Sequence, residues 1–256
     1  MKQASSLLKK SLLALAAVSA FGSAIAAPAD NADKTVVLVH GAFADGSSWD
    51  KIVPLLQAKG LKVVSVQNPL TSLADDVAAT KRAIDAQTGK VILVGHSWGG
   101  TVITQAGADA KVSALVYVAA FAPSEGEAVG ALGKEFPTPP GIAKLKADAS
   151  GFLSLPAQAV AEDFAQDLPA AQTNLMAVSQ GPINSKAFGE AVTVAAWKTK
   201  PSFYIVSAQD RMIAPGLEAA MAKKINATTT TLNTSHVPML SKPADVAAVI
   251  IAAAAK

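Results

Sequence analysis

The chain has 256 residues, of which 51% are hydrophobic and none is cysteine, and its formal net charge is +3. This length and composition predict a large core in one domain, or in one domain with an insertion. The lack of cysteine excludes disulfides, a thiolate nucleophile and Cys-based zinc or iron sites, and only three histidines argue against a histidine-rich metal centre. We therefore expect no metal and no other cofactor.

The first 26 residues have the pattern of a secretory signal peptide. Three lysines precede an apolar stretch, residues 11–26, which ends in Ala24-Ile25-Ala26. This stretch is shorter than the ~20 residues that span a bilayer, so we expect cleavage near Ala26, a periplasmic or secreted product and no stable membrane anchor. The three lysines account for the whole net charge, because the segment has no acid. The remaining chain therefore shows no electrostatic sign of nucleic-acid binding.

Six apolar runs predict the strands of one sheet. They cover residues 35–39, 61–66, 91–94, 112–119, 202–207 and 227–232, and the threonines of the last run are typical of an edge strand. Helical patterns alternate with them at residues 49–58, 73–86, 217–224 and 243–255. This alternation predicts an α/β domain over residues 27–256 with a doubly wound, mostly parallel sheet.

The alternation is interrupted between residue 122 and about residue 200. This segment is rich in proline, has short helical patterns such as residues 160–167, and shows no convincing strand. We interpret it as a mainly helical cap insertion over the carboxyl ends of the strands, where open α/β sheets bind ligands. A long surface excursion is the alternative, but unstructured loops of this length are rare in compact domains.

The sequence GHSWG, residues 95–99, lies between the predicted strand 91–94 and a helix predicted over 101–106. A glycine at each end permits a sharp, strained turn from strand to helix, and such a turn exposes its central serine at the sheet edge. We therefore expect Ser97 to be a nucleophile.

A serine hydroxyl needs a base that takes its proton. Of the three histidines, His40 directly follows the first strand and His96 lies inside the elbow, so we expect both to be local structural residues. His236 follows the last strand, in a loop that can reach over the elbow. His236 is therefore the predicted base.

The base in turn needs a carboxylate to orient it. Asp210 lies just beyond the strand at 202–207, and Glu125 follows the strand at 112–119 as an alternative. The position just after a predicted strand favours Asp210 over Glu125 only narrowly. The chain order Ser, Asp, His, which is the order of the α/β-hydrolases, favours it clearly.

An oxyanion formed by attack on a carbonyl needs backbone N–H donors. Trp98, which follows the nucleophile, supplies one, and the turn after the first strand supplies the other, with Ala42 as first choice and Phe43 as second. The apolar side chains that we expect around a substrate are Phe121, Phe136, Phe152, Phe164 and Met176.

Four motifs, VLVHGAFADGSSW, GHSWGG, QDRMIAP and SHVPML, occur in this order. Together they resemble the small α/β-hydrolases of the esterase and hydroxynitrile lyase group, which includes plant methyl-ester esterases, and the resemblance spans nearly all of residues 35–256. It implies a triad, two oxyanion donors and a mostly helical cap over residues 122–200. The implied triad is Ser97, Asp210 and His236, and the implied donors are Ala42 and Trp98.

Two positions depart from the members of this group that cleave cyanohydrins. Those members place a lysine directly after the catalytic histidine, where this chain has Val237, and a hydroxyl residue where it has Gly41. Both differences favour hydrolysis of an apolar carboxylic ester or lactone, a small-molecule substrate, through an acyl-enzyme. The alternatives are a hydroxynitrile lyase-like or haloperoxidase-like activity on the same scaffold, and a ligand-binding module without turnover.

Overall fold

The computed structural model describes residue 31 and residues 33–256, so the predicted signal peptide, residues 1–26, lies outside the described residues. One six-stranded sheet, in the order β2-β1-β3-β4-β8-β9, forms the centre of the molecule, and every neighbouring pair is parallel. All six predicted strands are present, and the threonine-rich last strand lies at an edge as predicted. The strands are β1 (Lys34–Val39), β2 (Lys62–Val66), β3 (Lys90–His96), β4 (Val112–Val118), β8 (Ser202–Ser207) and β9 (Thr228–Leu232).

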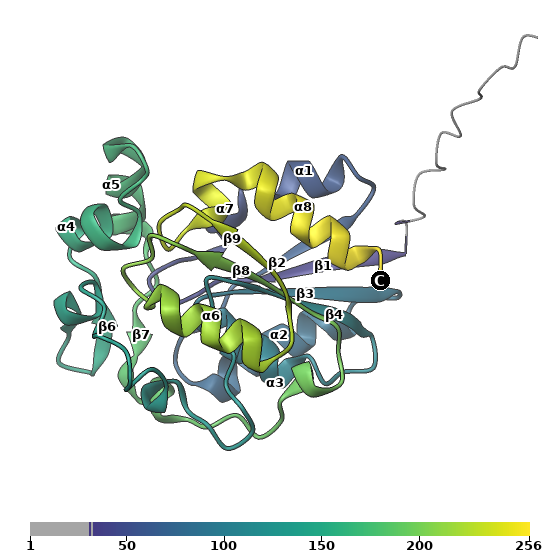
Figure 1. Ribbon diagram of the computed structural model, residues 1–256, viewed down its shortest axis with the longest axis horizontal. Helices are drawn as coiled ribbons and strands as arrows, with labels where there is room; N and C mark the ends of the chain where they lie inside the picture. The colour runs from purple at the N-terminus through teal and green to yellow at the C-terminus, as the bar shows by residue number, and fades with distance from the viewer. Residues whose placement is uncertain (1–30, 32) are drawn as a thin grey trace, which may run out of the picture.

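Helices cover both faces of the sheet, which explains why its central strands are apolar without alternation. The α1 and α8 helices lie on one face, α2 and α3 lie on the other, and α6 contacts β8 (Figure 1). Their bounds are α1 (Val53–Gln57), α2 (Leu73–Asp85), α3 (Trp98–Ala106), α6 (Pro215–Lys224), α7 (Pro238–Ser241) and α8 (Pro243–Ala254). The helix predicted over residues 49–58 is split into η1 (Gly46–Trp49) and α1, because Pro54 starts a new first turn.

The segment between β4 and β8 is gathered in large part at the carboxyl ends of the sheet strands, where α4, α5, β6 and β7 are seen in Figure 1. Its helical elements are η2 (Val129–Ala131), η3 (Ile142–Lys144), α4 (Ala157–Ala159), the π-helical η4 (Val160–Phe164), α5 (Ala170–Ser179), η5 (Ser185–Gly189) and η6 (Ala196–Lys198). It also contains a small antiparallel sheet, β5 (Lys146–Ala147), β6 (Phe152–Ser154) and β7 (Ile183–Asn184).

The expectation that this segment contains no strand is therefore wrong. Strands of two or three residues are too short to show an alternating pattern, and β7 pairs with β6 from across α4 and α5. Within residues 33–256, no helix combines the length and the apolar character that a membrane crossing requires.

Candidate active site

Ser97 lies at the junction of β3 and α3 with a φ of 53° and a ψ of −120°. This left-handed backbone is strained for a residue with a Cβ, and strain of this kind persists only where the surroundings hold it. The Ser97 N–H donates to the Val118 carbonyl at 3.2 Å, and the Ser97 carbonyl accepts from the Phe121 N–H at 3.2 Å. A Cβ at Gly99 would lie 2.4 Å from the Val39 carbonyl oxygen, so the elbow can approach β1 only with glycine there.

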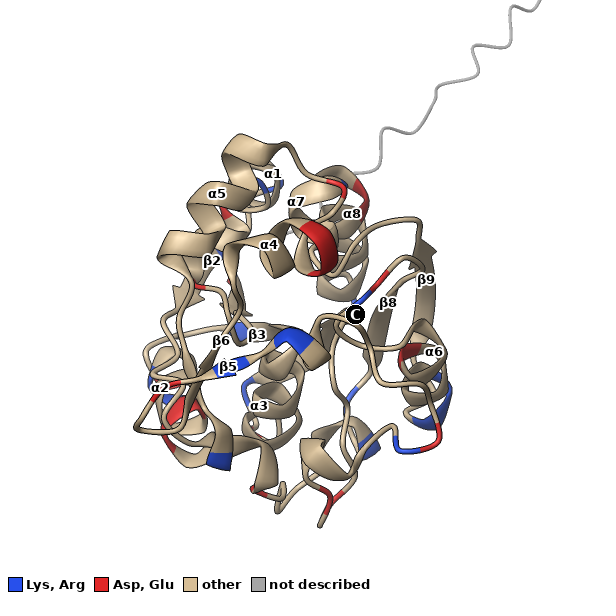
Figure 2. Ribbon diagram, turned by 90° about the vertical axis from the view of Figure 1, so that its left-hand side faces the viewer, with Lys and Arg blue, Asp and Glu red and all other residues tan. Residues whose placement is uncertain are grey.

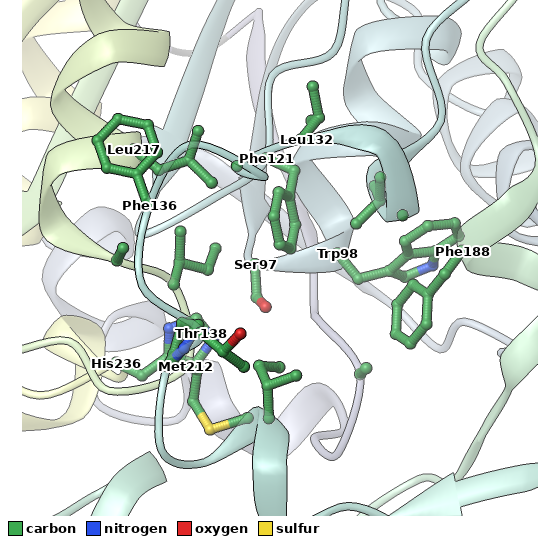
Figure 3. A pocket seen from close by; sticks show the side chains of 18 of the residues that line it. Ser97, Trp98, Phe121, Leu132, Phe136, Thr138, Phe188, Met212, Leu217 and His236 are labelled. Atoms are coloured by element: carbon green, nitrogen blue, oxygen red, sulfur yellow. The ribbon is translucent and has the colours of Figure 1, made fainter.

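The Ser97 side chain points into a cavity of about 410 Å³ (Figure 3). His236 and Met212 lie on one side of it, and Trp98 and Phe188 lie on the other. Ser97 and His236 both line this cavity. Within the described residues no hydrogen bond joins the Ser97 hydroxyl to His236, and bonds of this type often tighten only when substrate is bound.

Asp210 orients the His236 ring. His236 Nδ1 donates to Asp210 Oδ2 at 2.5 Å, and both side chains are buried. The other oxygen, Oδ1, accepts from the N–H groups of Met212 at 2.6 Å and Ile213 at 2.9 Å. Burial by itself would raise the pKa of Asp210, but the charge and hydrogen bond of His236, with further hydrogen bonds, outweigh burial and lower the pKa. Asp210 is therefore a carboxylate, and His236 keeps Nε2 free as an acceptor.

Glu125, the alternative acid, lies elsewhere. Its carboxylate pairs with Lys198 at 3.2 Å on the surface, and 59% of its side chain is exposed. The structure thus brings Asp210, and not Glu125, to His236.

The other two histidines are buried and hydrogen-bonded within the scaffold. His40 Nδ1 donates to the Gly41 carbonyl at 2.8 Å and its Nε2 accepts from the Asn68 N–H at 2.9 Å. His96 Nε2 donates to the backbone carbonyl of His236 at 2.8 Å. Burial lowers the pKa of His40 and lowers that of His96 well below its ordinary value, so both rings are neutral. His96 also supports the backbone of the predicted base.

The three predicted oxyanion donors all line the cavity. The Phe43 N–H, however, donates to the Gly181 carbonyl at 3.1 Å, which leaves Ala42 and Trp98 as the available pair. A Cβ at Gly41 would lie 2.6 Å from the Ser97 Cβ. This geometry has no room for the hydroxyl residue that the cyanohydrin-cleaving enzymes carry at this position.

The carboxylate of Asp76 on α2 holds the indole of Trp98 in place. Its Oδ2 accepts from Trp98 Nε1 at 2.7 Å, and its Oδ1 accepts from the Leu70 N–H at 2.8 Å. Burial raises the pKa of Asp76 to about 6, although both hydrogen bonds oppose the shift. Acidic residues are common in the first turn of a helix because they interact favourably with the helix dipole, so no local signal in the sequence distinguishes Asp76.

The cavity wall is almost entirely apolar. Phe121 and Phe136 line it as expected from the sequence, together with residues that were not expected there: Val129, Leu132, Ile142, Leu145, Leu153, Phe188, Met212, Ile213 and Leu217. Among the described residues, Lys134 is the one lysine, arginine or acidic side chain that lines the cavity, and it is exposed. No three His, Asp or Glu side chains of the described chain converge into a metal-binding cluster.

Three of the expected lining residues lie outside this cavity. Phe152 precedes Leu153 in β6, and neighbours in a strand point to opposite faces, so Leu153 reaches the cavity instead. Met176 lines a second cavity of about 250 Å³. Phe164 is buried and packs against His236, with 5.1 Å between the ring centroids.

Comparison with known proteins identifies the family and the fold. The sequence model of the alpha/beta hydrolase family matches residues 36–249. A probable hydrolase, R7, from Phoma sp. is 28% identical over 234 residues, which cover 81% of this chain and 93% of that protein. Methylesterase 7 of Arabidopsis thaliana is 36% identical over 111 residues, but these cover only 36% of this chain and 42% of the methylesterase.

A crystal structure of a pyrethroid hydrolase from Sphingobium faniae superposes with a TM-score of 0.73 at 22% identity. The superposition covers 87% of this chain and 97% of that chain. At this level of identity the likeness establishes the fold.

Proposed function

The chain belongs to the alpha/beta hydrolase family, and from this premise we propose that it is a serine hydrolase that cleaves apolar carboxylic esters or lactones through an acyl-enzyme. The observation that carries the proposal is the buried Asp210–His236 pair, which lies beside Ser97 in one apolar cavity. The names of two sequence relatives, a methylesterase and a pyrethroid hydrolase, support a hydrolase that cleaves esters.

In the proposed reaction, Ser97 Oγ attacks the ester carbonyl while His236 Nε2 takes its proton. Asp210, held by two backbone N–H groups, stabilises the imidazolium without taking the proton itself. The N–H groups of Ala42 and Trp98 donate to the developing oxyanion. His236 then protonates the leaving alcohol, and a water molecule activated by the same base hydrolyses the acyl-enzyme.

The cavity wall sets the expected substrate class. A volume of about 410 Å³ lined by aromatic and aliphatic side chains suits a compact, uncharged ester, because a buried charge would find no partner among the lining residues inside. Gly41 and Val237 argue against cyanohydrin cleavage.

We propose further that the protein is exported and that residues 1–26 are removed. The lysine-rich start, the apolar stretch and the Ala24-Ile25-Ala26 pattern support this. The intact mass of exported protein tests it, and a product that still begins at Met1 would contradict it.

The function is tested with a panel of p-nitrophenyl and aryl methyl esters, with cyanohydrin cleavage and bromide oxidation assayed in parallel. We expect ester turnover, labelling of Ser97 by a fluorophosphonate, and a loss of about 10⁴ to 10⁶ in kcat in Ser97→Ala with the fold intact. Near-normal turnover by Ser97→Ala would sink the hydrolase assignment. A stoichiometric burst without a second turnover would instead indicate a binding module.

A further inference from the structure

One short turn of the inserted segment contacts the loops that carry both the acid and the base. The turn comprises residues 163–167, at the end of η4 and just after it, and we call it the 163–167 turn. In Figure 2 the acidic turn after α4 lies beside α7, the helix that follows His236. Its contacts reach residues on either side of Asp210 and on either side of His236.

The contacts to the acid loop flank Asp210 directly. Arg211 Nε donates to Asp163 Oδ1 at 2.8 Å, and Gln166 Nε2 donates to the Gln209 carbonyl at 2.6 Å. One bond therefore falls on the residue before Asp210 and one on the residue after it. Because both partners come from the inserted segment, the acid loop is fixed from outside the main domain as well as by its own turn.

The contacts to the base loop also lie on both sides of His236, one on the residue before it and one at the end of α7. Asp167 Oδ2 accepts from the Ser235 N–H at 2.8 Å, and Asp167 Oδ1 accepts from Ser241 Oγ at 2.8 Å. One carboxylate thus joins the residue before His236 to the end of α7. Phe164, from the same turn, packs edge-on against the His236 ring.

Asp163 also ties the turn to the cavity wall. Its buried carboxylate pairs with Lys144 at 2.7 Å as well as with Arg211, and Lys144 lies in η3 between the lining residues Ile142 and Leu145. Burial would raise the pKa of Asp163, but the hydrogen bonds and charges of Lys144 and Arg211 outweigh burial and lower it. A buried carboxylate with two cationic partners is costly to separate from either of them, so the three elements are held as a unit.

We propose that the 163–167 turn is a positioning element for the Asp210–His236 pair, with Asp167 as the positioning residue of the base loop. This role rests on the proposed triad. No residue of the turn itself lines the cavity, and its contact with the base is the packing of Phe164 against the His236 ring, so the turn acts through the placement of the imidazole. A misplacement of about 1 Å in a reacting group costs on the order of 10²-fold in rate, which is the scale expected here.

Asp167 offers the sharpest test because it is exposed, so its truncation leaves no cavity in the core. We expect Asp167→Ala to lower kcat about 10- to 100-fold with little change in KM. Asp167→Asn, which keeps one acceptor oxygen, should recover most of the activity. Asp109→Ala is the matched control. Asp109 also accepts a backbone N–H, that of Lys111, at 2.8 Å, but it lies in the turn between α3 and β4, at the amino ends of the strands and away from the site.

Three readouts separate positioning from a merely structural role. The Tm of Asp167→Ala should fall no more than that of Asp109→Ala. The rate of Ser97 labelling by a fluorophosphonate should fall in step with kcat. In a His236→Ala background, Asp167→Ala should cause no further loss of kcat, because the base that Asp167 positions is absent. If Asp167→Ala does not yield folded protein, Ser241→Ala removes one of the two bonds and takes its place.

A kcat equal to that of the control, or an equal loss in the His236→Ala background, would overturn the proposal. The low-field proton resonance of the His236–Asp210 hydrogen bond provides a readout that needs no turnover: it should shift or broaden in Asp167→Ala and not in Asp109→Ala, and an unchanged resonance would also overturn the proposal. A wild-type protein without ester turnover would instead refute the proposed function, and the resonance would still test the turn.

Discussion

Replacement of Glu218 by glutamine should make the stability of the protein less dependent on pH. Glu218 lies on α6, fully buried, with Oε2 accepting the Ser207 N–H at 2.9 Å. Burial, and then the charge of Asp210, raise the pKa of Glu218 well above its ordinary value. Two neighbouring buried carboxylates that interact through their charges do not both ionise, so the proton remains on Glu218 and Asp210 is the carboxylate.

The sign of the effect follows from the raised pKa. The stability that such an acid contributes is fully present below its unfolded pKa, ordinarily 4.5, and is lost as the pH rises towards the folded value. Throughout that range each pH unit lowers the free energy of unfolding by about 1.4 kcal/mol. Two units therefore cost about 3 kcal/mol, or roughly 5 to 10 °C in Tm for a domain of this size. Glutamine keeps the neutral shape and the acceptor for the Ser207 N–H, so Glu218→Gln should not show this loss.

The measurement is thermal unfolding of the wild type, Glu218→Gln and the exposed control Glu125→Gln in steps from about pH 5 to about pH 9, which starts just above the ordinary glutamate pKa of 4.5. Asp76, with a pKa of about 6, titrates within this range in all three proteins, so its effect cancels when their Tm values are compared. We expect the Tm advantage of Glu218→Gln over the wild type to widen as the pH rises, while Glu125→Gln follows the wild type. An advantage that stays constant or shrinks would show that native Glu218 is ionised, and the reasoning would fail.

The remaining predictions concern the acid and the elbow. Asp210→Asn should lower kcat by about 10⁴-fold. The amide oxygen of the asparagine stays with the Met212 and Ile213 N–H groups, so its NH₂ faces His236 Nδ1 and imposes the wrong tautomer. Glu125→Gln is the control, and a large loss of kcat in this control with none in Asp210→Asn would move the acid to the loop after β4. Gly99→Val should yield little folded protein, since its Cβ meets the Val39 carbonyl at 2.4 Å, and a wild-type Tm would show that the close approach is unnecessary.

The sequence predicts well where Ser97, Asp210 and His236 lie, because the fold brings the same ends of parallel strands together. Ser97 follows β3, Asp210 follows β8 and His236 follows β9, so all three lie at the carboxyl edge of one sheet wherever the helices end. The strands themselves are predictable because a strand buried on both faces must be apolar throughout, as β3 is from Val91 to Val94.

The side chains that support the site could not be found in this way. Asp76, Glu218 and Asp163 lie in helical stretches where acids are usually solvated, and only tertiary packing buries them. Phe152 and Leu153 show a second limit: a strand of three residues does not reveal which of its faces meets the cavity. Whether a side chain is buried, and which way it points, depends on contacts with residues distant in the sequence, so no local pattern predicts either.

The parts of the proposed site differ in what holds them. The elbow of Ser97 is held within the main domain, through the Val118 carbonyl, the Phe121 N–H and the close approach of Gly99 to β1. The acid and base lie on loops that also depend on the 163–167 turn of the inserted segment. The cavity wall comes largely from a different part of that segment, residues 129–145. In the proposed mechanism, substrate fit and base alignment therefore depend on separate stretches of one insertion, which are joined by the Asp163–Lys144 ion pair. A substitution in the cavity wall can then alter KM without lowering kcat, as long as this ion pair stays intact.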